Sequence, residues 1–221
     1  MSAAELRFPL PAVILAGGQG RRMGRVKAQV VLGDKELLLH AVELVQGSCV
    51  PIVVSVRQSD VWVFELLKHS QDVTVVCDRD ATPTPMAGIV SSLEYLCSQA
   101  SHDWVLITSC DTMYHPWQLI STLAEKAANT PECTAAVFRI QNKYMPFPGL
   151  FRMDTLQAWK NALQNHRLRV QEFLASLPKL QCVDAQLLDS AIPDWYIANI
   201  NTAHDLTHAL EIMTMQRGTS V

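Results

Sequence analysis

The sequence lacks an excess of positive charge. Its 18 lysines and arginines stand against 21 aspartates and glutamates, which gives a formal net charge of −3 at pH 7. A protein that binds the phosphates of nucleic acid usually carries a basic face. We therefore expect no nucleic-acid partner.

Cysteines are few and widely spaced. The six lie at positions 49, 77, 97, 110, 133 and 182, and no two of them form a CxxC pair. This spacing excludes a zinc ribbon and a thioredoxin-type redox motif. We expect reduced thiols that pack in the core.

A long hydrophobic run is also missing. The first residues, MSAAELRFPLPAVILAGG, carry Glu5 and Arg7 and reach two glycines after a short apolar stretch. Such a segment is neither a secretory signal nor a membrane span. We predict a cytoplasmic protein with no membrane partner. The composition, 49% hydrophobic and 18% charged, is typical of a packed globular chain rather than a disordered one.

Short apolar segments rich in valine and isoleucine predict strands that are buried on both faces. They are nearly continuous rather than alternating, and they cover 12–16, 50–56, 73–77, 104–108 and 134–140. Segments with helical spacing lie between them, at 36–46, 60–69, 88–99 and 116–128, and Pro116 suits a first helical turn. The alternation predicts an α/β fold with a doubly wound sheet, in which ligands bind beyond the carboxyl ends of the strands.

The pattern changes after residue 140. The run KYMPFPGLFR is followed by helical spacing at 153–164 and 168–177, a short strand candidate at 195–200 and a last helix from about 203. No internal repeat is visible. We interpret this part as an elaboration of the same sheet that contacts a second substrate, within one domain covering 1–221.

A loop built for phosphate follows the first predicted strand. Residues 17–27 hold four glycines and four cations, so backbone N–H groups and charged side chains can both approach an anion. A tight solvated turn is the alternative. The loop is not a P-loop, because Arg25 follows Gly24. It also departs from the dinucleotide fingerprint, because the third glycine comes one place late and the second strand ends without an acid.

The loop and several later motifs resemble the molybdenum cofactor guanylyltransferase family. The loop contains Leu15-Ala16-Gly17-Gly18, then Arg22-Met23-Gly24 and Lys27. The later motifs follow in the family's order: Leu37 to His40, Asp78, Pro85-Met86-Ala87-Gly88-Ile89, Cys110-Asp111-Thr112, Phe147-Pro148-Gly149-Leu150-Phe151-Arg152, Arg169-Val170 with Phe173-Leu174, and Asn199-Ile200-Asn201-Thr202.

This resemblance spans almost the whole chain. It implies a Rossmann-like nucleotidyltransferase fold, which is a three-layer α-β-α sandwich around a mostly parallel sheet. It also implies transfer of GMP from GTP to molybdopterin, with release of pyrophosphate. Residues 12–140 would be the nucleotide-binding half and 141–221 the acceptor-binding elaboration. Transient contacts with other proteins of the cofactor pathway are implied as well.

The chemistry of such a transfer calls for cations, because both reactants are anions. Asp111 follows a buried strand, where a carboxylate suits Mg²⁺, although it could instead cap the helix near Pro116. Lys27 would place a point charge on the nucleotide phosphates. Arg22 could add a two-pronged phosphate contact. We therefore predict Arg22, Lys27 and Asp111 as the catalytic residues, with Asp111 as the metal ligand.

The resemblance implies further contacts on both substrates. For the nucleotide they are Leu15, Ala16, Gly17, Gly18, Lys27, Ser55, Asp78, Ala87, Gly88 and Asp111, and for the acceptor Arg169, Asn199 and Asn201. Residues 78–80 could instead form a polar turn. The two asparagines could equally serve the turn before the last helix, with Thr202 as its cap.

Some positions depart from the family pattern and leave the base preference open. Many members have Asp, Asn, Gly and Pro where this sequence has Val26, Ser55, Thr84 and Met113. The same fold acting on CTP, on another nucleotide or on a different phosphorylated acceptor is therefore an alternative. The residues leave two other hypotheses open: an NADP-dependent reductase, and a nucleotide-binding protein without turnover.

Overall fold

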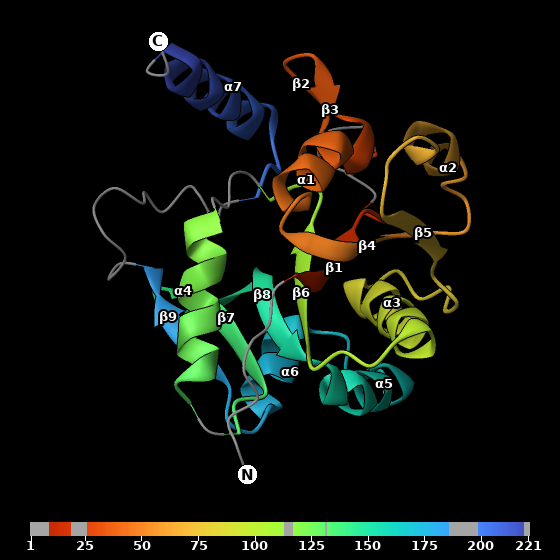
Figure 1. Ribbon diagram of the computed structural model, residues 1–221, viewed down its shortest axis with the longest axis vertical. Coiled ribbons are helices and arrows are strands. Elements are labelled where there is room, and N and C mark those ends of the chain that lie inside the picture. Colours follow the sequence, from red (N-terminus) through yellow and green to blue (C-terminus); the bar gives the residue numbers. More distant parts are fainter. Residues whose placement is uncertain (1–8, 19–25, 113–116, 131, 186–198, 219–221) are drawn as a thin grey trace.

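The protein is built around one seven-stranded sheet. The computed structural model describes residues 9–18, 26–112, 117–130, 132–185 and 199–218, and Figure 1 shows the arrangement. In the order β5-β4-β1-β6-β8-β7-β9, every described strand of this sheet is parallel except β8. The strands are β1 (Leu10–Leu15), β4 (Cys49–Val56), β5 (Val73–Cys77), β6 (Trp104–Ser109), β7 (Ala135–Ile140), β8 (Lys143–Arg152) and β9 (Gln181–Asp184).

Helices cover both faces of the sheet. On one face lie α1 (Leu37–Val45), α2 (Trp62–Leu67) and α4 (Trp117–Ala128), and on the other α3 (Pro85–Gln99), α5 (Leu156–Gln164) and α6 (Val170–Ser176). Each set buries its apolar side against one face of the strands, so two hydrophobic clusters form, one on each side of the sheet. The predicted three-layer α-β-α sandwich with a mostly parallel sheet is confirmed.

The strand order creates a switch point beside β1. The chain passes from β1 outward to β4 and β5, and it then returns to the other side of β1 as β6. The loops after β1 and β6 therefore leave in opposite directions at the same edge of the sheet. In open α/β sheets this is where a crevice for ligands forms.

Strand β8 was not predicted, because KYMPFPGLFR holds two prolines and a glycine. The pairing with β7 explains how the strand tolerates them: Val137 lies opposite Gly149, whereas Phe138 lies opposite Met145. Residues 146–148 thus form a bulge in which Pro146 and Pro148 need not donate to the ladder.

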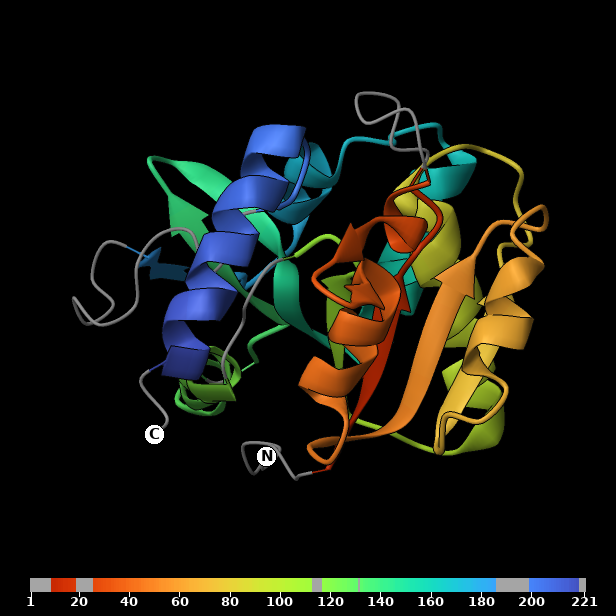
Figure 2. The same cartoon turned by 90° about the horizontal axis from the view of Figure 1, so that it is seen from above.

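A small hairpin and the last helix form a separate cluster. The hairpin consists of β2 (Val31–Leu32) and β3 (Lys35–Glu36), and Gly33 turns it with a φ of +71°. Helix α7 (Ala203–Gly218) packs beside the hairpin through apolar side chains, as Figure 2 shows. Thr202 caps this helix, as the alternative interpretation of the turn held, because Thr202 Oγ1 accepts the N–H of Asp205 at 3.1 Å.

Most predicted segments are confirmed with ends shifted by a few residues. The exceptions are the pieces with little periodicity: the hairpin, β8 and β9 were not predicted. Of the strand candidate 195–200, residues 195–198 lie outside the described residues, and Asn199 forms an isolated bridge with Thr112. Pro116 also lies outside them. All six cysteines are free thiols, and no described helix is long and apolar enough to cross a membrane.

Trp159 is the central side chain of the second cluster. It has no exposed surface, stacks on Phe173 with ring centroids 3.6 Å apart, and meets Phe151 edge-on at 5.6 Å. Trp159→Ala should lower the free energy of unfolding by about 3–5 kcal/mol in urea titrations, because the cavity cannot close fully. Phe64→Ala on α2, where the ring is 47% exposed, should cost no more than about 1 kcal/mol. Equal losses in the two variants would contradict this assignment of the core.

Candidate functional site

A cavity of about 870 Å³ lies at the carboxyl ends of the parallel strands. Its volume is in the range of small-molecule sites. The loops after four neighbouring strands contribute to it, and so do the bulge of β8 and the segment before α7. The lining residues are Leu15, Gly17, Gly18, Lys27, Ser55, Arg57, Gln58, Ser59, Asp78, Asp80, Ala81, Thr82, Pro83, Thr84, Pro85, Gly88, Ser109, Cys110, Asp111, Phe147 and Asn199.

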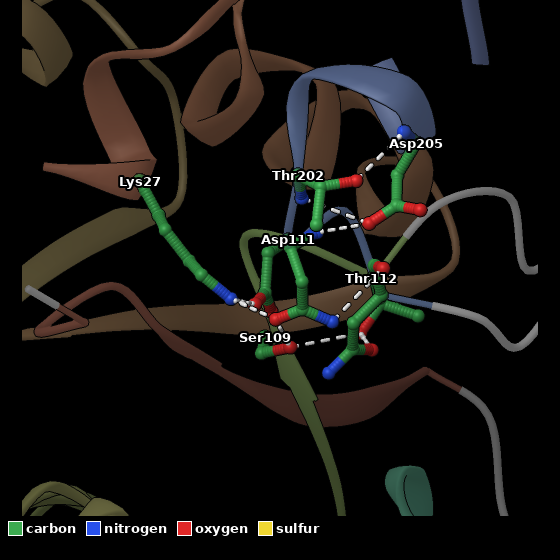
Figure 3. Close-up of polar contacts among 8 residues, drawn as sticks. Lys27, Ser109, Asp111, Thr112, Thr202 and Asp205 are labelled. Carbon is green, nitrogen blue, oxygen red and sulfur yellow. Dashed lines mark hydrogen bonds and ion pairs between the residues drawn. The ribbon is translucent and has the colours of Figure 1, made fainter. Parts of the chain in front are cut away.

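Lys27 and Asp111 form an ion pair at the switch point. Asp111 follows the end of β6, and Lys27 begins the short 3₁₀ helix η1 (Lys27–Gln29) after the glycine loop. Their side chains are 18% and 11% exposed. The Lys27 ammonium also donates to Asn201 Oδ1 at 2.6 Å. Residues far apart in the chain thus converge on one cation, as Figure 3 shows.

The Asp111 carboxylate is oriented by its own strand end. The Ser109 hydroxyl donates to Asp111 Oδ1 and lies 2.8 Å from the hydroxyl of Thr112. The backbone of Asp111 is held as well, because its carbonyl accepts the N–H of Ile200 at 2.8 Å. Thr112 bridges Asn199, so the segment before α7 lies against the end of β6.

The start of α7 holds Asn201 in place. Asp205 Oδ2 accepts the backbone N–H groups of Asn201 and Thr202, each at 2.8 Å. The Asn201 side-chain amide donates to the Asn199 carbonyl at 3.1 Å, which leaves its oxygen for Lys27. A helix cap therefore fixes an amide that contacts the catalytic candidate Lys27.

A second polar group lies at the ends of β4 and β5. The Ser55 hydroxyl donates to Asp78 Oδ1 at 2.7 Å. Gly88 of α3 lies in close contact with this pair. A Cβ at this position would lie 2.3 Å from Ser55 Oγ and 3.2 Å from Asp78 Oδ1. The absence of a side chain at Gly88 lets α3 approach the strand ends.

Burial raises the pKa of the Asp78 carboxyl above its ordinary value. The Ser55 hydrogen bond and the charge of Arg57 act in the opposite direction, while the neighbouring charge of Asp60 raises the pKa further. Burial also raises the pKa of the Cys110 thiol, another lining residue of the cavity, far above its usual range, which favours the neutral thiol.

Arg57 and Asp60 make a two-pronged contact at the rim. The guanidinium Nε and Nη2 atoms each lie 3.1 Å from a different oxygen of the buried Asp60 carboxylate. The Arg57 stem also borders the glycine loop, because a Cβ on Gly17 would lie 3.3 Å from Arg57 Cγ. This pair supports the loop after β1 from the side of β4.

The structure brings most of the predicted residues together. Nine of them line the cavity: Leu15, Gly17, Gly18, Lys27, Ser55, Asp78, Gly88, Asp111 and Asn199. Asn201 joins them through Lys27. Ala16 and Ala87 are buried and are not among the lining residues.

The structure does not bring Arg169 to the cavity. Arg169 lies at the cap of α6, is 82% exposed and pairs with Glu172, and it is not among the lining residues. Arg22 lies outside the described residues. Among the positions that depart from the family pattern, Thr84 caps α3 by accepting the N–H of Met86 at 3.4 Å. Met113 also lies outside the described residues.

Sequence reasoning missed the residues that support the site. Ser109 precedes Asp111 by two positions, so the side chains of the strand end face the same way. The Arg57–Asp60 pair lies just after β4. Asp205 carried a usable signal, since Thr202-x-x-Asp205 has the spacing of a capping box.

The donors around Asp111 suit a hard cation. Among the described residues, no group of three or more His, Cys, Asp or Glu side chains could hold a metal by itself. Asp111 instead has the oxygen atoms of Ser109 and Asn201 nearby. Mg²⁺ commonly binds one or two carboxylates, several waters and substrate phosphates. The residues present therefore fit Mg²⁺ that arrives with a phosphorylated ligand.

The chain is similar to known proteins over nearly its whole length. Residues 12–180 match the family model described as the MobA-like NTP transferase domain. Over 211 residues the chain is 31% identical to the molybdenum cofactor guanylyltransferase of Rhizobium johnstonii, covering 90% of this chain and 91% of the relative.

Solved structures share the fold. Molybdopterin-guanine dinucleotide biosynthesis protein A from Archaeoglobus fulgidus is similar with a TM-score of 0.74 at 21% identity, covering 93% of this chain and 100% of that one. The 4-diphosphocytidyl-2C-methyl-D-erythritol synthase of Anaerococcus prevotii is similar with a TM-score of 0.66 at 15% identity, covering 93% and 96%. At these identities the likeness concerns the fold alone.

The close approach at Gly88 predicts a specific rescue. Gly88→Ala should lower the free energy of unfolding by about 1–3 kcal/mol, because the new methyl group overlaps Ser55 Oγ. The double variant Gly88→Ala/Ser55→Ala should be more stable than Gly88→Ala alone. Gly18→Ala is the control, since its Cβ would lie 3.7 Å from Lys27 Cδ, an ordinary contact. Urea unfolding of the four proteins checks this, and a double variant no better than Gly88→Ala would contradict it.

The raised pKa of Asp78 predicts a pH-dependent stability. The folded state binds the Asp78 proton more tightly than the unfolded state, so stability falls as pH rises from the ordinary Asp pKa through the folded value. Asp78→Asn should therefore increase the free energy of unfolding at pH 7, and the gain should shrink as the pH falls through the raised pKa and be lost below about pH 3.9.

Asp80→Asn is the matched control with the opposite sign. Hydrogen bonds from Thr82 lower the pKa of Asp80, so its carboxylate stabilises the protein above the ordinary Asp pKa and this contribution is lost in acid. Urea unfolding at a series of pH values distinguishes the two. The same sign for both variants at pH 7 would refute the assignment.

Proposed function

Because the chain belongs to the family of MobA-like NTP transferases, we propose that its cavity binds GTP and that it transfers GMP to molybdopterin. As a member of this family the chain is a nucleotidyltransferase. The observation that carries the proposal is the meeting of Lys27 and Asp111 at the switch point, inside a cavity bordered by Gly17 and Gly18. The relative from Rhizobium johnstonii is named for guanylyl transfer to the molybdenum cofactor.

The proposed reaction transfers the GMP unit of GTP to a phosphate of the acceptor. A phosphate oxygen of the acceptor attacks the α-phosphorus of GTP, a new P–O bond forms, and the bond to the departing pyrophosphate breaks. Both reactants carry negative charge, so the rate depends on positioning and on neutralising that charge. Bound Mg²⁺ would neutralise phosphate charge and orient the phosphates.

The residues of the chain divide this work. Lys27 would place its ammonium on the nucleotide phosphates, and Asp111 would hold Mg²⁺. Gly17 and Gly18 let the backbone approach the phosphates closely. The Ser109 hydroxyl keeps the Asp111 carboxylate turned into the cavity. Arg22 stays a proposed phosphate contact.

The ends of β4 and β5 form the proposed nucleoside side. Asp78 and Ser55 can accept and donate hydrogen bonds there, and Gly88 keeps the wall open. Ala16 and Ala87 shape this wall from beneath, where both are buried. The base selected is guanine in this proposal, and a panel of nucleotides tests it.

The opposite side of the cavity would receive the acceptor. Phe147 from the β8 bulge and Asn199 line it, which suits a flat heterocycle with amide partners. Asn201 borders this side through its contact with Lys27. Arg169 is proposed to contact the acceptor from outside the cavity, and proteins of the cofactor pathway are proposed as transient partners.

Ligand-dependent thermal unfolding tests the nucleotide. GTP, CTP, ATP and NADPH would each be added with and without Mg²⁺, because a ligand that binds only the folded state raises the unfolding temperature. GTP with Mg²⁺ should give the largest shift, and molybdopterin should then trigger release of pyrophosphate. If CTP or ATP raises the unfolding temperature most, the base that the cavity selects is cytosine or adenine rather than guanine. A shift with NADPH alone would overturn the proposal.

Asp111→Asn tests the proposed metal ligand. Pyrophosphate release should fall at least about 100-fold, because the neutral amide supports Mg²⁺ poorly. Asp103→Asn is the control: Asp103 is an exposed carboxylate just before the other end of β6. It should leave the rate within about twofold of wild type. Near-normal turnover in Asp111→Asn would remove this residue from the metal site.

A further inference from the structure

Asp111, the proposed metal ligand, and Lys27, the proposed phosphate contact, are bound to each other in the structure. Lys27 pairs with Asp111 Oδ2, while the Ser109 hydroxyl occupies Oδ1. Both oxygens of the carboxylate therefore already have a donor. Figure 3 shows the Lys27 side chain reaching across to Asp111.

A divalent cation and the Lys27 ammonium compete for this carboxylate. Mg²⁺ binds oxygen ligands at about 2.0–2.1 Å in near-octahedral geometry. An ammonium that touches the same oxygen would lie within about 4 Å of the dication, where like charges repel strongly in a partly buried site. The side chains of Lys27 and Asp111 are only 18% and 11% exposed, so water screens this repulsion weakly.

Hydrogen bonds beyond the ion pair fix the position of the Lys27 ammonium. Asn201 Oδ1 accepts a second hydrogen bond from the ammonium at 2.6 Å. Asp205 fixes the backbone of Asn201 by accepting its N–H at 2.8 Å. Two oxygen atoms from different parts of the chain thus surround the ammonium, as they would a small hard cation.

Phosphates bound beside Gly17 and Gly18 would give the Lys27 ammonium a second partner. The lysine stem borders the glycine loop, since a Cβ on Gly18 would lie 3.7 Å from Lys27 Cδ. Phosphates bound at the loop would attract the ammonium, and the flexible four-carbon stem allows it to move.

We infer that Lys27 fills the cation position at Asp111 until nucleotide phosphates draw its ammonium away, so that the protein binds little divalent metal without a nucleotide. This inference rests on the proposed function, because the metal role of Asp111 belongs to it. Metal and nucleotide then enter the site together, and Lys27 couples the two events.

Binding of Mn²⁺ to the nucleotide-free protein tests the inference. Free Mn²⁺ would be measured by electron paramagnetic resonance during titration of wild type, Lys27→Met, Asp111→Asn and the double variant Lys27→Met/Asp111→Asn. Lys27→Met keeps the length of the side chain without its charge and should bind Mn²⁺ at least about tenfold more tightly than wild type. The double variant should lose that gain.

Two control variants separate this effect from a general change of charge. Lys27→Arg keeps the positive charge and should bind Mn²⁺ as weakly as wild type. Lys68→Met breaks the exposed ion pair with Glu65 at the end of α2, neither of which lines the cavity, and should bind no better than wild type. Circular dichroism establishes that each variant is folded, and Lys27→Gln replaces Lys27→Met if the latter fails to fold.

The outcomes distinguish this inference from the proposed function. If wild type binds Mn²⁺ as tightly as Lys27→Met, or if the double variant keeps the gain, the inference is wrong. If GTP binds the wild-type protein but Lys27→Met gains no Mn²⁺ affinity, the inference falls and the nucleotide assignment stands. If Lys27→Met gains affinity through Asp111 while GTP fails to bind, Lys27 still fills the cation position at Asp111, and the proposed function and the release of Lys27 by GTP both fall.

Discussion

The ion pair between Lys27 and Asp111 depends on the adjacency of β1 and β6 in the middle of the sheet. Because these two strands are neighbours but are far apart in the sequence, their loops meet at one edge and bring a cation and a carboxylate together. Both β1 and β6 are almost completely buried. The two hydrophobic clusters on either face pack against the strands in this order. The strand ends that carry the ion pair therefore belong to the buried centre of the sheet.

The last part of the chain completes this arrangement from outside the sheet. The bridge between Asn199 and Thr112 and the bond from Ile200 to Asp111 attach the segment before α7 to the end of β6. The cap at Asp205 then aims Asn201 at Lys27. A helix that packs mainly on a two-stranded hairpin thereby takes part in the electrostatics of the cavity. Residues before position 140 and residues of the last part of the chain thus share one network of hydrogen bonds.

Sequence reasoning predicted the alternating fold and the strand-end residues because both follow from simple patterns. Runs such as those of β1 and β6 are buried on both faces, and in parallel sheets polar side chains collect at the carboxyl ends. It missed the supporting contacts of Ser109 and the rim pair of Arg57 and Asp60, since these depend on which strands become neighbours. It also missed β8, whose prolines are acceptable only where pairing is interrupted. The local composition of the sequence shows neither which strands become neighbours nor where the pairing of two strands is interrupted.

The bulge of β8 makes the number of residues at one wall of the cavity independent of the register between β7 and β8. Residues 146–148 have no pairing partner on β7, because Phe138 pairs with Met145 and Val137 with Gly149. The strand pairing therefore does not fix how many residues lie between these two pairs. Phe147, which lies in this stretch, nevertheless reaches the cavity. Insertion or deletion of a residue there would reshape one wall while the paired strands on both sides kept their register. The shape of the cavity on that side can thus change without any change in the β1–β6 centre that holds Lys27 and Asp111.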